Sequence, residues 1–248
     1  MPRKLGQHFL ASESILEQIA AATQVNPGRI VEIGPGRGAL TRHLLPLCEE
    51  LHAIEIDVRL AASLATRFAG KPNLHIHHSD VLATDLAQWG PAVIAGNLPY
   101  YITSPIIERF LQLDARFPAA VFLMQWEVAQ RLLAQPHSRD YGYLTVATQT
   151  VCHVELVCKV PPSAFSPPPK VESAALRLTR RAELTPDLPA LLQFVGRCFT
   201  HKRKTLRNNL RPFYGAAIDA MPESGLRAEQ LPLEEFALLR SRLTRNRG

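Results

Sequence analysis

Between residues 29 and 125 the chain alternates short apolar runs with amphipathic segments, and this alternation constrains the fold most. The apolar runs are typical of buried strands and lie at 29–34, 51–57, 73–80, 92–97 and 119–125. The segments with helical spacing lie at 12–22, 38–47, 58–68 and 103–113. Strand–helix alternation of this kind predicts a parallel sheet with helices on both faces.

The pattern changes beyond residue 143. Residues 143–160 are rich in β-branched side chains, and the proline-rich FSPPPK follows before another apolar run at 171–179. We expect a pair of strands joined by an extended loop, closing the α/β sheet with an antiparallel edge. After Arg181 the pattern is helical, with breaks expected at Pro212 and Pro222. The sequence therefore predicts an α/β domain over 1–180 and a small all-helical domain over 181–248.

The positive charge of the chain is concentrated in its last quarter. Residues 181–248 hold 12 Lys and Arg against 7 Asp and Glu, whereas residues 1–180 hold 16 against 15. The stretch 196–211 has six basic side chains and no acidic one. Such asymmetry indicates a polyanionic partner, and a solvated helix face is the alternative.

Several classes of protein are disfavoured by composition. No run approaches the 18 apolar residues of a membrane span, and the first residues carry no apolar signal segment. The four cysteines form no C-x-x-C pair, which fits the reducing cytoplasm. His75, His77 and His78 have no carboxylate or cysteine completing a ligand set, so we expect no metal site.

A glycine-rich turn separates the first two predicted elements of the alternating region. VEIGPGRGALT has glycines at 34, 36 and 38, a spacing that differs from the G-x-G-x-x-G of dinucleotide-binding proteins. Glycine lets the backbone approach a ligand closely, and helix amides then face the bound molecule. The turn indicates a ligand that has no pyrophosphate. The alternative is a tight strand–helix turn that binds no ligand.

Two acidic residues at strand ends sharpen this interpretation. Glu55 ends the second predicted strand and can accept hydrogen bonds from both hydroxyls of a ribose. Asp80 ends the third, where a carboxylate can accept from an adenine amine. With Gly34 and Gly36 they fit a nucleoside, and they suit S-adenosylmethionine at least as well as NAD.

The fourth predicted strand ends in Asn97-Leu98-Pro99-Tyr100, beside this pocket. The lone pair of an adenine N6 amine is delocalised, and two acceptors on its N–H bonds would localise it. The Asn97 side-chain oxygen is one acceptor, and a carbonyl near Pro99, aimed by the fixed φ of proline, is the other. Tyr100 offers a flat face for the base, and its ring can stabilise a cationic methyl donor.

These stretches resemble the S-adenosylmethionine-dependent rRNA adenine N6,N6-dimethyltransferases. Further similar stretches are KLGQHFL at 4–10, FSPPPKVES at 165–173 and CFTHKRKTLRNNL at 198–210. The last resembles the signature of the branch that acts on small-subunit rRNA. The resemblance implies a Rossmann-like methyltransferase domain and a basic helical domain that binds RNA in the ribosome.

The resemblance also implies roles for individual residues. The cofactor contacts fall on His8, Leu10, Gly34, Glu55, Asp80 and Asn97. Many relatives have Asn at the position of His8, so its side chain could alter affinity. Phe165 is implied to stack on the flipped base opposite Tyr100. RNA phosphates are expected on Lys202, Arg203, Lys204 and Arg207.

The resemblance implies that two adjacent adenosines in the 3′-terminal hairpin loop of small-subunit rRNA each receive two methyl groups. We expect a cytoplasmic monomer whose partner is an assembling ribosomal subunit. The alternatives are a large-subunit rRNA methyltransferase of the macrolide-resistance type, an NAD-linked oxidoreductase, and a non-catalytic assembly or transcription factor on the same fold.

Overall fold

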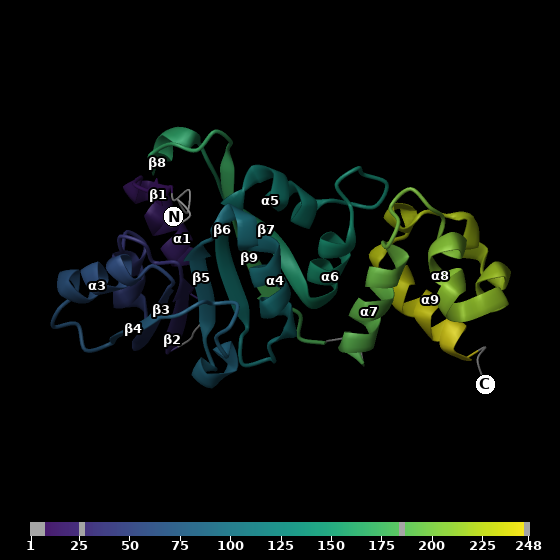
Figure 1. Ribbon diagram of the computed structural model, residues 1–248, viewed down its shortest axis with the longest axis horizontal. Coiled ribbons are helices and arrows are strands. Elements are labelled where there is room, and N and C mark those ends of the chain that lie inside the picture. Colours follow the sequence, from purple (N-terminus) through teal and green to yellow (C-terminus); the bar gives the residue numbers. More distant parts are fainter. Residues whose placement is uncertain (1–7, 25–27, 184–186, 246–248) are drawn as a thin grey trace. The chain divides into compact units, whose positions relative to one another are not determined.

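The computed structural model of the chain describes residues 8–24, 28–183 and 187–245. It divides into two compact units, whose elements are labelled in Figure 1. The first contains Met1–Ala129 and His153–Arg180, and the second contains Gln130–Cys152 and Arg181–Gly248. One of the three breaks falls after Arg180, where the sequence places the boundary, and the breaks after Ala129 and Cys152 have no counterpart in the prediction. Residues 130–152, which the sequence assigned to the first domain, belong to the second unit.

A seven-stranded sheet with the order β4-β3-β2-β5-β6-β9-β7 forms the centre of the first unit in the described part of the chain. Its strands are β2 (Arg29–Ile33), β3 (Glu50–Glu55), β4 (Leu74–His78), β5 (Val93–Asn97), β6 (Ala119–Gln125), β7 (Cys152–Val160) and β9 (Ser173–Arg180). The pairs among β2 to β6 are parallel, and β9 pairs antiparallel with β6. The predicted parallel sheet with an antiparallel strand is therefore confirmed.

Helices cover both faces of this sheet, as the alternation of side chains along β6 shows. Leu123 lies in the same apolar cluster as Leu16 of α1 (Glu13–Ala22). Phe122 points the other way and packs edge-on against Phe110 of α4 (Thr103–Gln112), with ring centroids 6.2 Å apart. A third helix, α3 (Val58–Arg67), packs beside β3 and β4 (Figure 1). The sheet is thus the middle layer of three.

The helix predicted at 38–47 is shorter in the structure. Gly38 has φ +78°, a left-handed conformation that cannot belong to a right-handed helix. The helical region is α2 (Thr41–Leu44), followed by a 3₁₀ turn at Leu45–Leu47. The glycine turn therefore extends to residue 40 and leaves more backbone free to face a ligand.

The strand predicted to begin at residue 143 is wrong in its first half. Tyr143–Val151 form the helix α6, and β7 begins only at Cys152. Helical threonines can direct their hydroxyls to carbonyls of the preceding turn, as Thr150 does to Val146 at 2.7 Å. Burial of the α6 face against α7 (Leu188–Cys198) then outweighs the weak strand preference of β-branched residues.

The remaining helices build the core of the second unit. They are α5 (Trp126–Leu133), which begins in the first unit, α7, α8 (Leu206–Tyr214) and α9 (Leu233–Arg245). Fully buried Phe194, Leu210 and Phe236 belong to one apolar cluster. The break predicted at Pro212 is wrong, because Pro212 lies inside α8, whereas Pro222 begins a new 3₁₀ turn. None of the described helices is long and apolar enough to cross a membrane.

Candidate active site

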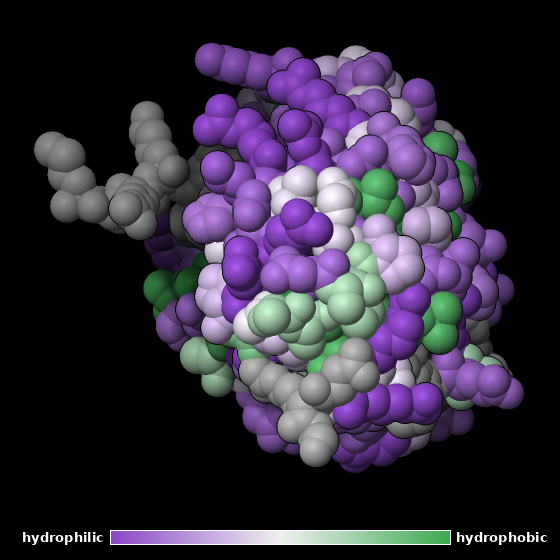
Figure 2. Space-filling model, turned by 90° about the vertical axis from the view of Figure 1, so that its right-hand side faces the viewer, coloured by the Kyte–Doolittle hydropathy of each residue, from purple (hydrophilic) through white to green (hydrophobic). Residues whose placement is uncertain are grey.

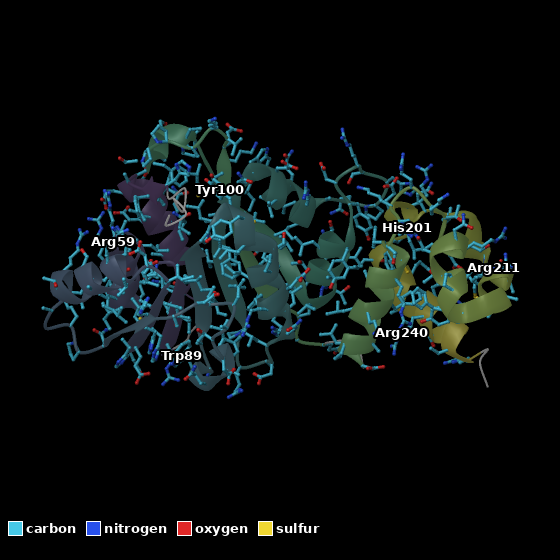
Figure 3. The ribbon with its side chains drawn as sticks, viewed as in Figure 1. Arg59, Trp89, Tyr100, His201, Arg211 and Arg240 are labelled. Atoms are coloured by element: carbon cyan, nitrogen blue, oxygen red, sulfur yellow. The ribbon has the colours of Figure 1, made fainter. Side chains whose placement is uncertain are left out.

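A cavity lies at the carboxyl ends of β2, β3, β4 and β5, where open α/β sheets bind ligands. Every residue that the sequence assigns to donor binding lines it, from His8 and Leu10 to Asn97. Pro99 and Tyr100 line it too. Figure 3 shows Tyr100 at this end of the sheet and Trp89 at the opposite end. The topology thus brings together residues that are up to 92 positions apart in the chain.

The glycine turn forms one wall of the cavity. Gly34 and Gly36 both have left-handed backbones, with φ +66° and +56°. A Cβ on Gly36 would lie 3.0 Å from the ring of Phe9, so the N-terminal segment approaches this turn as closely as a glycine allows. The Gly36 amide donates to Oε2 of Glu55 at 3.0 Å. This contact joins the turn to the adjacent strand.

Glu55 ends β3 and is nearly buried, with 3% of its surface exposed. Its second oxygen, Oε1, accepts from the Asp57 amide at 3.0 Å. Each carboxylate oxygen has two lone pairs, so both still have capacity for another donor. The two backbone amides fix the carboxylate in orientation, which prepares it to receive a pair of neighbouring hydroxyls.

Asp80 is the second residue after the end of β4. Its Oδ1 accepts from the Leu82 amide at 2.8 Å, and Thr84 donates to its carbonyl at 2.7 Å. These contacts close a turn that holds an exposed carboxylate on the cavity wall. Strand β4 ends at His78 rather than at residue 80, so this carboxylate belongs to the turn and not to the strand.

Asn97 is the last residue of β5 and is half-buried. Its Nδ2 donates to the carbonyl of His8 at 3.1 Å. Its Oδ1 accepts no hydrogen bond from the described residues. Since the amide nitrogen is anchored, the oxygen is held as an available acceptor on the cavity wall.

The Pro99 carbonyl is engaged within the chain, so the acceptor that the sequence predicts near Pro99 is a different carbonyl. It accepts from the Ile102 amide at 3.1 Å and from the Thr103 hydroxyl at 3.2 Å, and so it begins the following helical turn. The carbonyl of Leu98, one residue earlier, accepts no turn or side-chain hydrogen bond from the described residues. Leu98 is itself fixed by its amide, which donates to Leu123 at 2.9 Å. The available acceptor beside Asn97 is therefore Leu98.

Tyr100 is held at both ends of its side chain. Its hydroxyl lies 2.9 Å from the hydroxyl of Ser173, and its ring stacks near His8 with centroids 6.0 Å apart. Burial raises the pKa of the Tyr100 phenol and the bond with Ser173 opposes this, so the phenol is neutral near pH 7. A neutral phenol cannot serve as a base near pH 7.

The N-terminal segment closes the cavity through a second, two-stranded sheet. Strand β1 (Phe9–Leu10) pairs antiparallel with β8 (Phe165–Ser166). The imidazole of His8 contacts the Pro167 carbonyl at 2.8 Å through Nδ1, while its own carbonyl holds Asn97. His8 thus serves the site through its backbone, and its side chain ties the segment to the loop after β8. The rest of the predicted segment, residues 4–7, lies outside the described residues.

Phe165 is the predicted site residue that the structure does not bring to the cavity. It is 4% exposed and belongs to the apolar cluster of α1 and the sheet. Its partner in β1 is Leu10, whose side chain lines the cavity instead. The sequence could not reveal this, because a phenylalanine in a proline-rich loop is compatible with either a base-stacking or a packing role.

Comparison with known proteins decides the family. The family model described as ribosomal RNA adenine dimethylase matches residues 1–242. The chain belongs to this family. Its enzymes use S-adenosylmethionine, so the donor predicted from the glycine turn and Glu55 is confirmed and the NAD-linked oxidoreductase is set aside.

Individual relatives of this dimethylase match along most of their length. Ribosomal RNA small subunit methyltransferase A of Acidobacterium capsulatum is 43% identical, over 95% of this chain and 89% of the relative. The protein of that name from Hydrogenovibrio crunogenus is 41% identical, over 96% and 94%. Among solved structures, a dimethyladenosine transferase from Plasmodium falciparum superposes with a TM-score of 0.81 at 28% identity, over 94% and 97%. The 23S rRNA methyltransferase ErmE gives 0.71 at 31%, over 95% and 99%.

The cavity of this dimethylase fits S-adenosylmethionine. Glu55 has free lone pairs for two ribose hydroxyls, and Asp80 presents a carboxylate beside it. A Cβ on Gly34 would lie 3.6 Å from the carbonyl of Asn97, so the backbone of the glycine turn lies close to the end of β5. A donor that spans from Glu55 to Asn97 would pass over this point.

One acidic residue of the cavity was not predicted from the sequence. Glu32 lies in β2 and lines the cavity, although only 1% of its surface is exposed. Its Oε2 accepts from the Thr41 hydroxyl at 2.7 Å. The available signal was a single carboxyl within the apolar run RIVEI, where a strand buried on both faces has no place for a charge.

The predicted RNA-binding residues lie in the second unit, at the turn before α8 and in its first turn. Lys202 lies 3.9 Å from Glu229, and Arg207 lies 3.1 Å from Asp219. Arg203 and Lys204 are exposed and form no ion pair with any described residue. Buried Asn209 fixes the turn by donating to the Cys198 carbonyl at 2.7 Å and the His201 carbonyl at 3.2 Å. Hydrophilic residues cover most of the face in Figure 2.

The histidines of β4 pack together at the far end of the sheet. His75 and His77 both stack on His52 of β3, with centroids 4.9 and 5.3 Å apart. Burial lowers the pKa of His52 and of His77. No group of three His, Cys, Asp or Glu within residues 8–24, 28–183 and 187–245 has the arrangement of a metal site.

Proposed function

We propose that this enzyme methylates N6 of two adjacent adenosines in the 3′-terminal hairpin loop of small-subunit rRNA, giving N6,N6-dimethyladenosines. It acts as a monomer on an assembling subunit in the cytoplasm. The observation that carries the proposal is the pair of available acceptors, Asn97 Oδ1 and the Leu98 carbonyl, on the wall of a nucleoside-binding cavity. The names of the relatives, which refer to the small subunit, support the choice of rRNA.

The two acceptors activate the amine of the target base. S-adenosylmethionine supplies an electrophilic methyl carbon on a sulfonium. Asn97 and Leu98 each accept one N6 hydrogen and draw the nitrogen toward tetrahedral geometry, so its lone pair becomes localised. Both are preorganised by contacts of 3.1 Å to His8 and 2.9 Å to Leu123. Catalysis is then mainly positioning and electrostatics.

No general base is required for this reaction. Methylation of a neutral amine leaves a cationic nitrogen, which loses its proton readily to water. The strand order from Asn97 outward is β5, β2, β3, β4. Glu55 on β3 is therefore two strands away from Asn97, and Asp80, which follows β4, is three strands away. Their place in the sheet suits them to hold the donor rather than to remove the proton.

Tyr100 positions the base by stacking, which is worth about 1–3 kcal/mol per base. The Ser173 hydroxyl and the His8 ring hold the phenol ring. Phe165 takes no part in this arrangement, since it is packed in the core. A base in a hairpin loop is already partly unstacked, which lowers the cost of bringing it into the cavity.

Affinity for the subunit comes from the basic turn of the second unit. Arg203 and Lys204 have no competing acidic partner among the described residues, so they are available to phosphates. Lys202 and Arg207 would exchange Glu229 and Asp219 for phosphates. Contacts of this kind supply affinity without reading sequence, so specificity then comes from the shape of the RNA.

Neutralising this turn is expected to weaken subunit binding and reduce its salt dependence. The variant K202Q/R203Q/K204Q removes three phosphate contacts, which lowers the slope of log affinity against log salt by about 3. Filter binding to undermethylated small subunits at several salt concentrations measures this. K71Q/R59Q, which changes exposed cations of the first unit, is the control. An unchanged slope in the triple variant would show that RNA binds at another surface.

Removing the carboxylate of Glu55 is expected to weaken donor binding. Glu55→Ala loses two charge-assisted hydrogen bonds to the ribose, so the dissociation constant rises about 10- to 100-fold or more. Calorimetric titration with S-adenosylmethionine measures it, with Glu17→Ala on the exposed face of α1 as the control. Equal affinities for both variants would place the ribose elsewhere.

The substrate is tested most directly by mass spectrometry of rRNA from cells that lack the protein. Loss of dimethyladenosine from the small-subunit hairpin alone supports the proposal. Loss from large-subunit rRNA would favour the activity named for ErmE, which superposes on this chain at a TM-score of 0.71. Unchanged methylation in both RNAs, together with intact subunit binding, would indicate a non-catalytic assembly factor.

A further inference from the structure

An exposed aromatic side chain on the rim of the cavity has no role in the mechanism above. Among the described residues that line the cavity, the exposed ones are Arg37, Ile56, Asp80 and Tyr101. Ile56 and Asp80 follow β3 and β4, on the donor side of the cavity. Tyr101 follows β5, the strand that ends in Asn97, and 62% of its surface is exposed. Tyr101 therefore lies on the side of the cavity that receives the target amine.

The backbone of Tyr101 is fixed, although its ring is free. Tyr100, Tyr101 and Ile102 form a 3₁₀ turn. The Pro99 carbonyl closes this turn by accepting from the Ile102 amide at 3.1 Å and from the Thr103 hydroxyl at 3.2 Å. The side chain of Tyr101 makes no hydrogen bond and no ring contact with any residue in the described ranges. A rigid turn thus presents an aromatic ring that no other part of the described chain covers.

The two tyrosines of the turn point in different directions. Successive residues of a 3₁₀ helix are about 120° apart around its axis. Tyr100 (Figure 3) is half-buried, and its hydroxyl lies 2.9 Å from that of Ser173, so its ring belongs to the wall of the cavity. Tyr101 is exposed and belongs to the rim. The turn therefore offers one aromatic face inside the cavity and another at its entrance.

The RNA chain must pass this entrance when a base is methylated. A target adenosine that enters the cavity stays joined to its neighbours by phosphodiesters, so the adjacent nucleotides remain at the rim. Each of them has lost the target base as a stacking partner. An aromatic ring can replace that partner whatever the base is, because every base has a π face. The uncharged ring of Tyr101 suits a base better than it suits a phosphate.

We propose that Tyr101 is a second stacking platform, which binds the nucleotide next to the target adenosine while Tyr100 stacks on the target itself. In a pair of adjacent adenosines, one neighbour of each target is the other member of the pair. The inference rests on the reaction given under Proposed function. Its consequence is that the ring of Tyr101 raises kcat/KM for the ribosomal subunit and does not change the affinity for the donor.

Tyr101→Ala is expected to lower kcat/KM for undermethylated small subunits about 5- to 100-fold, the range that stacking of a base on an aromatic ring accounts for. Tyr101→Phe should keep the native kcat/KM, because the hydroxyl has no partner. Leu156→Ala is the control, since it removes an exposed apolar side chain of β7 that does not line the cavity. Calorimetric titration with S-adenosylhomocysteine should give the native affinity for all three variants, which shows that the cavity is intact.

Removal of the neighbouring base tests the stacking from the RNA side. The hairpin is the 3′-terminal one, so a synthetic 3′ fragment with an abasic nucleotide on either side of the target adenosine can be ligated to the rRNA and assembled into subunits. An abasic nucleotide lacks the base and keeps the phosphate. The native enzyme should lose kcat/KM on one of the two abasic subunits, and Tyr101→Ala should cause no further loss there. Mass spectrometry of the target position measures the methylation.

The outcomes separate this inference from the proposed function. Native kcat/KM in Tyr101→Ala overturns the inference and leaves the reaction intact. A loss in Tyr101→Ala that persists on both abasic subunits also overturns it, because Tyr101 would then act on something other than the neighbouring base. An equal loss in Tyr101→Phe would assign the effect to the hydroxyl and not to the ring. Failure of the native enzyme to methylate undermethylated small subunits would refute the proposed function, and the inference with it.

Discussion

Replacing Asn97 with alanine is expected to reduce methyl transfer about 10²- to 10³-fold or more while leaving donor and subunit binding nearly unchanged. The side-chain oxygen of Asn97 is held ready for a proton of the target amine, since its nitrogen is anchored to the His8 carbonyl at 3.1 Å. Removing one preorganised hydrogen-bonding group from a transition state costs this much in comparable sites. The loss falls on the chemical step because localisation of the lone pair matters only there.

The measurement is single-turnover transfer of labelled methyl groups to undermethylated small subunits, with donor and subunit binding measured separately. Asn73→Ala is a suitable control, because Asn73 donates to the Leu45 carbonyl at 3.4 Å and does not line the cavity. Near-normal transfer by the Asn97 variant would refute the role assigned to its amide. Loss of donor binding in the same variant would show that Asn97 serves the cofactor rather than the base.

The sequence predicts the catalytic half of the molecule well because several independent signals agree there. Short apolar runs, the glycine turn and acidic residues at strand ends all indicate one edge of a parallel sheet. The structure places Gly34, Glu55, Asp80 and Asn97 around one cavity at that edge. Parallel strands end on the same side, so topology alone carries these residues together.

The errors arise where local preference and tertiary packing disagree. Residues 143–151 have β-branched side chains but form α6, whose buried residues include Thr145, Val146 and Val151. Burial of that face within the second unit decides the conformation, and sequence periodicity over nine residues is too short to reveal it. Pro212 cannot donate to the Asn208 carbonyl, but α8 ends two residues later, at Tyr214, so proline and the end of the helix coincide closely.

The sequence also could not predict the hydrogen bonds that orient site residues and join parts of the chain far apart in sequence. The bond between Asn97 and His8 joins residues 89 positions apart, and its atoms are a side-chain amide and a backbone carbonyl. A backbone carbonyl leaves no trace in residue identity, so the residue type at position 8 could not reveal this contact. The sequence predicts an acceptor carbonyl near Pro99, but residue identity alone does not say that it belongs to Leu98.

Replacing Gly96 with alanine is expected to lower the free energy of unfolding by about 2–4 kcal/mol and to abolish transfer as well. Gly96 of β5 pairs with Ile33 of β2, and a Cβ added to it would lie 2.4 Å from the Ile33 carbonyl oxygen. A backbone atom in the middle of the sheet cannot turn aside as a side-chain end can. The two strands must therefore separate, and Asn97 lies one residue beyond.

Urea unfolding with circular dichroism measures the loss, and Gly225→Ala is the matched control. Gly225 has open space around its missing Cβ and no left-handed backbone, so alanine there should be neutral or slightly stabilising. Equal stability of the two variants would show that β5 moves freely against β2. That result would also weaken the preorganisation of Asn97, because the amide keeps its position only if the strand that carries it is fixed against its neighbour.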